Sequence, residues 1–439
     1  DTTSAIHQLQ AAGGQWIDQS STDPTFLIAH FLLPGTAFRI AASIPGVFSI
    51  QPVPTSGGLR SEMSDQVNVG NYDGTNLAFP GYQSWLTSAG VDGSGVIIAN
   101  VDAGIDQSHP DLANRMAPCT GSSCGGSASD THGTHTAGIM AADGSSGVTD
   151  SRGFLRGLGV APGAHLVEQL YSPTYTTANG MYELMTQSYR NGASISGNSW
   201  GPSAYPVGYD MDTRQVDIGV RDADPDPDVV GNQSINYVLS IMNGHGGVSS
   251  QGTPDEAKNA FTIGSTKLQN YSDGSQDLNI NDLSSNTGQG PALDGRLIPH
   301  MVAPGCQVDS TTPSASYMLL CGTSMASPQV SGAAALFIQY YRSQFSVDPS
   351  PAMVKAAFLP VAHDLAGHLD ADGYTLGHPF DAKQGWGRLD LAAVVTPSVA
   401  VKYFDAPVVL SGSGEEWTRT FSPADPSKPV RLMLVWTGA

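Results

Sequence analysis

Three short segments of the sequence carry the side chains that nucleophilic catalysis by serine requires. Asp102 ends the apolar run "GVIIANVD", His132 lies in "DTHGTHTAG", and Ser324 lies in "CGTSMASPQVSG". A serine nucleophile needs a base within hydrogen-bond reach, a group that orients this base, and donors for the developing oxyanion. By itself Asp102 is typical of a turn and Ser324 of a helix N-cap. His132 and His135 share one predicted helix face and could bind a metal or pack in the core, so the combination of the three segments, rather than any one of them, predicts acyl transfer.

The oxyanion donors are expected from two further features. Asn243 follows the apolar run "YVLSIM" and precedes "GHGG", so a side-chain amide is held at a strand end beside a glycine-rich turn. Ser324 is expected at the start of the long apolar helix in "SPQVSGAAALFIQYYRSQF". Backbone N–H groups and the positive end of the helix dipole then point at the reaction centre.

These residues need a scaffold that brings strand ends together. Apolar strand runs alternate with helical patterns from about Gly95 to Leu391, which predicts one α/β domain with a doubly wound, mostly parallel sheet. In such sheets catalytic groups lie at the carboxyl ends of the strands.

The two ends of the chain differ from this pattern. Residues 1–60 predict a small α+β unit with a linker, and residues 61–396 the α/β domain. Residues 397–439 predict the first strands of a β-sandwich, in "KYFDAPVVL", "EWTRTF" and "PVRLMLVW". The N-terminal unit is expected to contain helical segments at Ser4–Ala12 and Thr36–Ala42, strands at Gln15–Gln19, Phe26–Leu33 and Val47–Val53, and a boundary at Pro54–Arg60.

In their order Asp, His, Ser, the three segments resemble the motifs of the subtilisin-like serine proteases, the subtilases. The matching stretches are "VDAGIDQSHPDL", "HGTHTAGIMAA" and "GTSMASPQVSGAAAL", and the resemblance extends from about Ser84 to Thr396 through "GVAPGAHL", "SWG", "PDEAKNAFTIGST" and "DGRLIPHMVAPG". The triad of the subtilisins has this same chain order. The resemblance implies a subtilisin-like fold and a serine endopeptidase that needs no cofactor for its chemistry.

The resemblance also implies roles for individual residues. Ser324 is the implied nucleophile, His132 the general base and Asp102 the group that orients it, while His135 is structural. The implied oxyanion hole consists of Asn243 and the Ser324 backbone N–H.

Substrate contacts are implied as well. A substrate strand would pair with "LVEQLYS" around Glu168 and with Ser199, Trp200 and Gly201. Met242 and Trp200 are candidate walls of the pocket for the residue before the scissile bond. Protein or peptide substrates are therefore the expected partners.

Several stretches depart from the family pattern. Ala103 replaces the usual Ser or Thr after the aspartate, and "MNGHGG" replaces the common "AGN" before the oxyanion asparagine. The calcium loop after the His helix is replaced by "DGSSGVTDSRGFLRG", so structural calcium is possible but not implied there. The N-terminal unit resembles an inhibitory propeptide that would be a partner of the catalytic domain, with Ser56–Asn68 crossing the active site before cleavage; a permanently attached domain is the alternative.

Composition and cysteine spacing indicate the compartment and exclude some partners. The charge is 19 basic minus 39 acidic residues, or −20, which disfavours nucleic acid and anionic lipid as partners. No apolar run is long enough for a membrane span, and no signal peptide is recognised. Local pairing of Cys119 with Cys124 and of Cys306 with Cys321 predicts two disulfides, with free thiols as the alternative. Disulfides favour a secreted, extracellular protein.

Other interpretations compete with this one. "GNSWG" matches the nucleophile elbow of an α/β-hydrolase, with Ser199, Asp364 and His378 as its triad. A catalytically silent binding protein and a transpeptidase or peptide cyclase would use the same fold. Two acidic clusters are weak calcium candidates and two sites match the glycosylation sequon. The clusters are Asp222, Asp224, Asp226 and Asp228, and Asp370 with Asp372; the sequons begin at Asn232 and Asn270.

Overall fold

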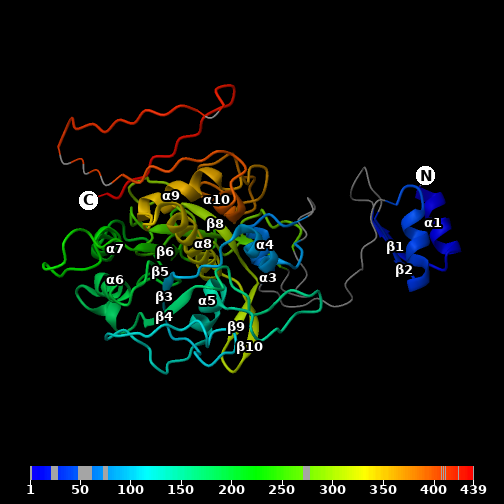
Figure 1. The fold of residues 1–439 in the computed structure, drawn as a ribbon, viewed down its shortest axis with the longest axis horizontal. Helices are drawn as coiled ribbons and strands as arrows, with labels where there is room; N and C mark the ends of the chain where they lie inside the picture. The colour runs from blue at the N-terminus through cyan, green and yellow to red at the C-terminus, as the bar shows by residue number, and fades with distance from the viewer. Residues whose placement is uncertain are drawn as a thin grey trace. The chain divides into compact units, whose positions relative to one another are not determined.

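The structure is a computed structural model that divides into two compact units, Asp1–Gly57 and Gly58–Ala439 (Figure 1). It describes residues 2–20, 28–47, 62–72, 78–269, 277–406, 408, 410, 412–423 and 425–438. Most of the predicted strand Val47–Val53, the boundary Pro54–Arg60 and the sequon at Asn270 lie outside these residues. Each unit is described by itself.

The N-terminal unit contains a two-stranded antiparallel ladder and two helices that contact each other. Gln15 pairs with Leu32, and the rings of Trp16 and Phe31 meet edge to face at 5.2 Å. Its described elements are α1 Thr2–Ala11, β1 Gln15–Ser20, β2 Ile28–Leu32, the 3-10 turn η1 Gly35–Ala37 and α2 Phe38–Ser43.

The second unit is built on a parallel sheet with the strand order β4-β3-β5-β6-β7-β8. The strands are β3 Ile97–Asp102, β4 His165–Leu170, β5 Ile195–Asn198, β6 Asn236–Ser240, β7 Phe261–Lys267 and β8 Met301–Cys306. This confirms the predicted doubly wound α/β fold. Since β4 lies on one side of β3 and β5 on the other, the strand order reverses at β3, and ligands bind at such a switch point.

Helices cover both faces of this sheet (Figure 1). One face packs against α5 Thr131–Ala141 and α8 Thr323–Phe345, and the other against α6 Gly180–Arg190 and α7 Met211–Arg221. Ile98 faces the first core and Ala99 the second, so both faces of β3 are apolar, as its continuous apolar run predicted. The remaining elements are α3 Glu62–Asn68, α4 Tyr82–Ala89, η2 Thr174–Thr176, β9 Val308–Thr312, β10 Ser316–Leu320, α9 Pro351–Phe358, η3 Leu359–Val361 and α10 Leu391–Val395.

Helix α3 differs from what the resemblance implied. Residues 62–68 were expected to lie in a cleavable crossing segment, but every residue of α3 is buried in the second unit. Met63 and Val67 pack with Met325, the neighbour of Ser324. The helix is therefore part of the second unit, because its apolar side chains fill that core.

The strands predicted after α10 are not formed in the described residues of 397–438. A strand exists only in a hydrogen-bonded ladder, and this extended stretch has no ladder partner among them. Exposure alternates along the last part of this stretch, as it does in a strand. Leu432, Leu434 and Trp436 are exposed, whereas Met433 and Val435 are partly covered. The β domain stays a prediction.

Two further expectations concern the whole chain. Disulfides join Cys119 to Cys124 and Cys306 to Cys321, which confirms the local pairing. Within the described ranges, no helix combines the length and the apolar character that a membrane crossing demands.

Candidate active site

Asp102 and His132 meet at the carboxyl end of β3. His132 Nδ1 lies 2.9 Å from Asp102 Oδ1 and 3.0 Å from Oδ2. Asp130, the N-cap of α5, accepts hydrogen bonds from the backbone N–H groups of His132 and Gly133. The cap fixes the start of the helix, and so the histidine is presented to the strand end.

Two donors hold the Asp102 carboxylate, although Ala103 lacks the hydroxyl that a Ser or Thr would have at this position. The Ala103 N–H donates to Oδ1 at 2.8 Å, and the Thr136 hydroxyl lies 3.2 Å from Oδ2. Helix α5 lies close to the turn after β3 because Gly133 has no side chain. A Cβ there would lie only 2.2 Å from the Gly104 oxygen. A threonine on α5 thus supplies a hydroxyl to the carboxylate in this chain.

Electrostatics separate the two histidines of α5. Burial alone would lower the pKa of His132, but the charge and hydrogen bond of Asp102 outweigh it, and the pKa is raised above its ordinary value. Burial lowers the pKa of His135 to about 3. His135 Nε2 lies 2.9 Å from the Met318 oxygen, so this residue is a packed neutral histidine rather than a metal ligand.

Ser324 lies in the first turn of α8, which is fastened to the end of β5. The Ser324 hydroxyl donates to the Ser199 oxygen at 3.2 Å, and the Ser199 hydroxyl donates to the Ser324 oxygen at 3.0 Å. Ser327 also donates to the Asn198 oxygen at 3.3 Å. Within the described chain no hydrogen bond joins Ser324 to His132, and such bonds often tighten only when substrate binds.

Asn243 is oriented by the residue before Ser324. Its Oδ1 accepts hydrogen bonds from the Thr323 N–H at 2.9 Å and the Thr323 hydroxyl at 3.0 Å, so Nδ2 remains as a donor. A Cβ added to Gly322 would lie 3.3 Å from Asn243 Nδ2 and 3.6 Å from Ser324 N. Two donors therefore converge on the space beside Gly322.

The candidate substrate residues follow β5 and β6. Trp200 stacks on Tyr171 with ring centroids 4.6 Å apart, and Tyr175 meets it edge to face at 5.5 Å. A Cβ on Gly201 would lie 2.3 Å from the Thr253 oxygen and 3.6 Å from Met242 Cε, so Met242 packs beside Gly201. Tyr171 lies in the predicted substrate segment "LVEQLYS" but was given no role of its own, and Tyr175 was not predicted, although aromatic residues just after an apolar strand were a usable signal.

The edge expected around Glu168 is already occupied. Bridges of Met116 with Leu166 and of Cys124 with Gln169 cover the outer side of β4. Glu168 is buried, and it accepts hydrogen bonds from the Ile105 N–H and the Gln107 side chain. The part of the segment that lies within β4 is therefore not free to pair with a substrate strand, while pairing at Tyr171 and Ser172 stays a prediction.

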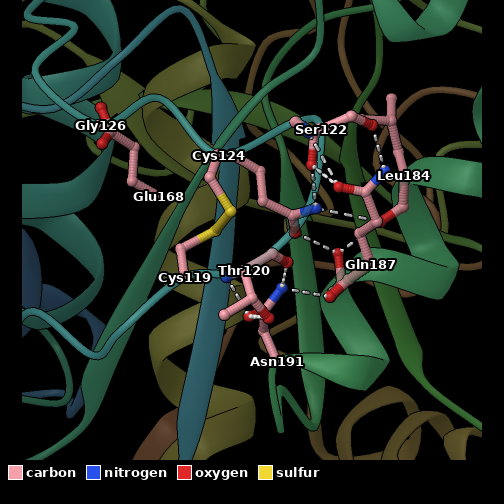
Figure 2. Close-up of a disulfide and its surroundings, with 12 residues drawn as sticks. Cys119, Thr120, Ser122, Cys124, Gly126, Glu168, Leu184, Gln187 and Asn191 are labelled. Atoms are coloured by element: carbon pink, nitrogen blue, oxygen red, sulfur yellow. Dashed lines mark hydrogen bonds between the residues drawn. A yellow bond between two sulfur atoms is a disulfide. The ribbon is translucent and has the colours of Figure 1, made fainter.

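Figure 2 shows the disulfide loop that covers this edge. The Ser123 N–H donates to Gln187 Oε1 at 2.9 Å, and the Thr120 N–H donates to Asn191 Oδ1 at 2.7 Å. Both acceptors belong to α6 or follow it. The Cys119–Cys124 loop is thus docked on α6 through side-chain acceptors.

Residues 143–157, at the position of the family's calcium loop, are held by protein donors. Asp111 beneath this loop accepts hydrogen bonds from the Ser146 N–H at 2.7 Å and the Tyr317 hydroxyl at 2.5 Å. Arg156 pairs with Asp309 and lies over the Tyr317 ring. Calcium needs oxygen acceptors rather than N–H and guanidinium donors, so these residues do not fit the ion.

The other metal candidates also bind protein groups. Asp224 pairs with Arg190, Asp370 with Lys383, and Asp372 accepts the Gly247 N–H. No group of three or more His, Cys, Asp or Glu side chains in the described part of the chain is arranged to hold a metal ion.

The hydrolase triad is not assembled. His378 lies 2.7 Å from Asp364 at the surface, but the Ser199 hydroxyl is directed to the Ser324 oxygen. Asn232, the first residue of the other glycosylation sequon, is exposed just after the acidic cluster Asp222–Asp228.

Comparisons with known proteins agree with this geometry. The model of the subtilase family matches residues 93–387. Subtilisin BL of Lederbergia lenta is 34% identical over 260 residues, which cover 57% of this chain and 78% of that protein. Subtilisin E of Bacillus subtilis (strain 168) is 31% identical over 266 residues, 58% of each protein. The solved structure of sphericase, 23% identical, superimposes with a TM-score of 0.52 over 74% of this chain and 96% of its own, which shows a shared fold.

Proposed function

Since the chain belongs to the subtilase family and is a serine-type endopeptidase, we propose that Ser324, His132 and Asp102 are its catalytic triad. The observation that carries this proposal is the hydrogen bond of His132 Nδ1 to the buried Asp102 carboxylate. It leaves Nε2 as the basic nitrogen of the neutral ring.

In the proposed reaction Ser324 Oγ attacks the scissile carbonyl carbon while His132 Nε2 takes the hydroxyl proton. The negative oxygen receives hydrogen bonds from Asn243 Nδ2 and the Ser324 N–H, and Asp102 stabilises the imidazolium. His132 then protonates the leaving amine, and a water molecule hydrolyses the acyl-enzyme by the same route in reverse. No metal or organic cofactor takes part in these steps.

Protein or peptide substrates are proposed to pair with the segment Ser199–Gly201 as an added strand. Trp200 and Met242 would contact the substrate side chains nearest the cleaved bond. Trp200 is stacked on Tyr171, and Met242 is packed beside Gly201.

The proposed setting is extracellular, because both disulfides persist in an oxidising environment. Residues 1–60 are proposed to act as a propeptide of the catalytic domain, residues 61–396. Residues 397–439 are proposed to begin a β domain. A permanently attached N-terminal domain is the alternative for the first unit.

A fluorophosphonate probe tests the triad. We expect covalent labelling at Ser324 in the chain without residues 1–61, loss of labelling in Ser324→Ala, and normal labelling in Ser343→Ala, a control at the exposed end of α8. Absence of labelling in the folded protein would favour a silent binding protein. Incubation of a peptide substrate with an added amine, followed by mass spectrometry, separates hydrolysis from transpeptidation.

A further inference from the structure

The segment that carries Asn243 needs external support. Between Met242 and Gly252 lie Gly244, Gly246 and Gly247, and the Asn243 side chain is exposed. Glycine gives a backbone more freedom than other residues do. An oxyanion donor is effective only when it is held in place before the reaction, so this loop must be tied down.

One buried carboxylate ties both ends of this loop. Asp255 Oδ2 accepts hydrogen bonds from the Met242 N–H at 3.0 Å and from the Gly252 N–H at 2.6 Å. Asp255 is 1% exposed, and its own carbonyl accepts the Thr262 hydroxyl of β7. A single oxygen thus closes the loop 242–252 one residue away from Asn243.

We propose that Asp255 is a positioning residue for the oxyanion hole, which holds Asn243 through the Met242 backbone and makes activity depend on its own ionisation. The proposal rests on the role proposed above for Asn243. Asp255 touches neither the substrate nor the reacting atoms, so it acts on the rate by fixing the direction of the Asn243 amide.

Opposing effects of its surroundings set the pKa of Asp255. Burial raises its pKa to about 6, against the lowering effect of the Gly252 and Met242 hydrogen bonds, and Glu256 raises it further. Tyr237 of β6 also faces it: burial, then the charge of Asp255 and that of Asp212, raise the pKa of this tyrosine. No Lys or Arg is among the groups that shift the pKa of Asp255, and in the described residues its Oδ1 is buried without a hydrogen-bond partner.

Protonation of Asp255 weakens the two hydrogen bonds, since a carboxylate accepts from N–H about twice as strongly as a neutral group. As the pH falls, His132 is protonated before Asp255, because the pKa of His132 is raised above 6.5 and that of Asp255 is about 6. A protonated His132 no longer acts as a base. Below about pH 6 both groups bind protons. If the protonated form keeps about a tenth of the rate, the slope of log kcat/KM against pH is expected to rise from about 1 to about 1.5 below about pH 6.

Asp255→Asn mimics the protonated form while it keeps an acceptor oxygen. At pH 8 we expect kcat to fall about tenfold with little change in KM, and the acid slope to return to about 1. Stability is not expected to fall: a raised pKa in the folded state means that the ionised form costs stability above about pH 6. Asp217→Asn is the matched control, because Asp217 is also buried and accepts an N–H and a hydroxyl, from Asn259 and Tyr209.

A double-mutant cycle separates this role from a general structural one. If Asp255 acts through Asn243, then Asp255→Asn lowers kcat in the wild type but not in Asn243→Ala. An equal decrease in both backgrounds, or an unchanged acid slope in Asp255→Asn, would overturn the inference. If Asn243→Ala itself has no effect on kcat, the proposed oxyanion hole fails instead. Should Asp255→Asn not fold, the wild-type slope decides, and a slope of about 1 down to pH 5 rejects the inference.

Discussion

Single residues set the electrostatics of the proposed triad, and His132 gives the first prediction. The Asp102 charge overcomes the effect of burial and raises the pKa of His132 above 6.5. A general base must be neutral, so labelling of Ser324 by a fluorophosphonate is expected to slow as the pH falls through this raised value. In Asp102→Asn, burial remains without the carboxylate, and the pKa of His132 falls. The labelling rate of Asp102→Asn is then expected to be about 10⁴-fold lower than that of the wild type. Labelling of the wild type that is as fast at pH 5 as at neutral pH would contradict the triad.

Gly322 gives a second prediction at this scale, because the two oxyanion donors converge beside it. Its φ of 172° is extended backbone that any residue adopts, so alanine there adds a Cβ without backbone strain. This Cβ would lie 3.3 Å from Asn243 Nδ2. We expect Gly322→Ala to lower kcat about tenfold or more while the melting temperature changes little.

Gly377 provides a control for this substitution. It is exposed, and a Cβ there meets no atom within 4 Å. Gly377→Ala should therefore leave kcat unaltered. Equal activity of the variants at 322 and 377 would show that the space beside Gly322 is not used in the reaction.

At the scale of elements, the loop 143–157 is predicted to be independent of calcium. Tyr317 of β10 donates to Asp111 beneath it, and Arg156 pairs with Asp309 of β9. Chelation with EDTA is expected to leave the melting temperature unchanged. Tyr317→Phe leaves the buried Asp111 with one donor fewer and should cost about 1–3 kcal/mol.

Calcium titration of the same variant provides the check. If added calcium restores the stability of Tyr317→Phe, or if EDTA lowers the melting temperature of the wild type, protein donors do not replace the ion. Tyr374→Phe, at an exposed ring, is the control for loss of a hydroxyl.

Elements also show what could be predicted from the sequence. Strand β3 was recognisable because both of its faces are buried, which makes "GVIIANVD" continuously apolar, and α8 because of its length and small residues. The cover of β4 was not, since Met116 and Cys124 contribute isolated bridges that have no strand periodicity. The strands after α10 were predicted from local alternation, which cannot supply a ladder partner.

The same limit applies to the site. Asp102, His132, Asn243 and Ser324 were proposed because each follows a strand or opens a helix in a recognisable motif. Asp255 lies in the family-like stretch "PDEAKNAFTIGST", but nothing in the sequence gave it a role, because "TPDE" is typical of a turn. Its significance arises only where the chain brings Gly252 and Met242 to one oxygen.

At the scale of the whole molecule, α3 decides where the catalytic unit begins. Glu62 accepts the N–H groups of Gly81, Tyr82 and Leu155 at 2.6, 2.7 and 2.9 Å. Asn68 Nδ2 donates to Gln329 Oε1 of α8 at 2.7 Å. Both ends of α3 are thus bonded into the catalytic unit.

We therefore predict that a chain without residues 1–61 folds and is labelled at Ser324, whereas a chain without residues 1–68 is not. The shorter deletion keeps α3, and the product should fold and react with a fluorophosphonate at Ser324. The longer deletion empties the space of Met63 and Val67, at about 1.5–3 kcal/mol for each side chain, and leaves three N–H groups without the Glu62 carboxylate. We expect this product to be insoluble or unlabelled. Equal labelling of the two products would show that α3 is dispensable, and failure of both would show that the chain needs its N-terminal unit in order to fold.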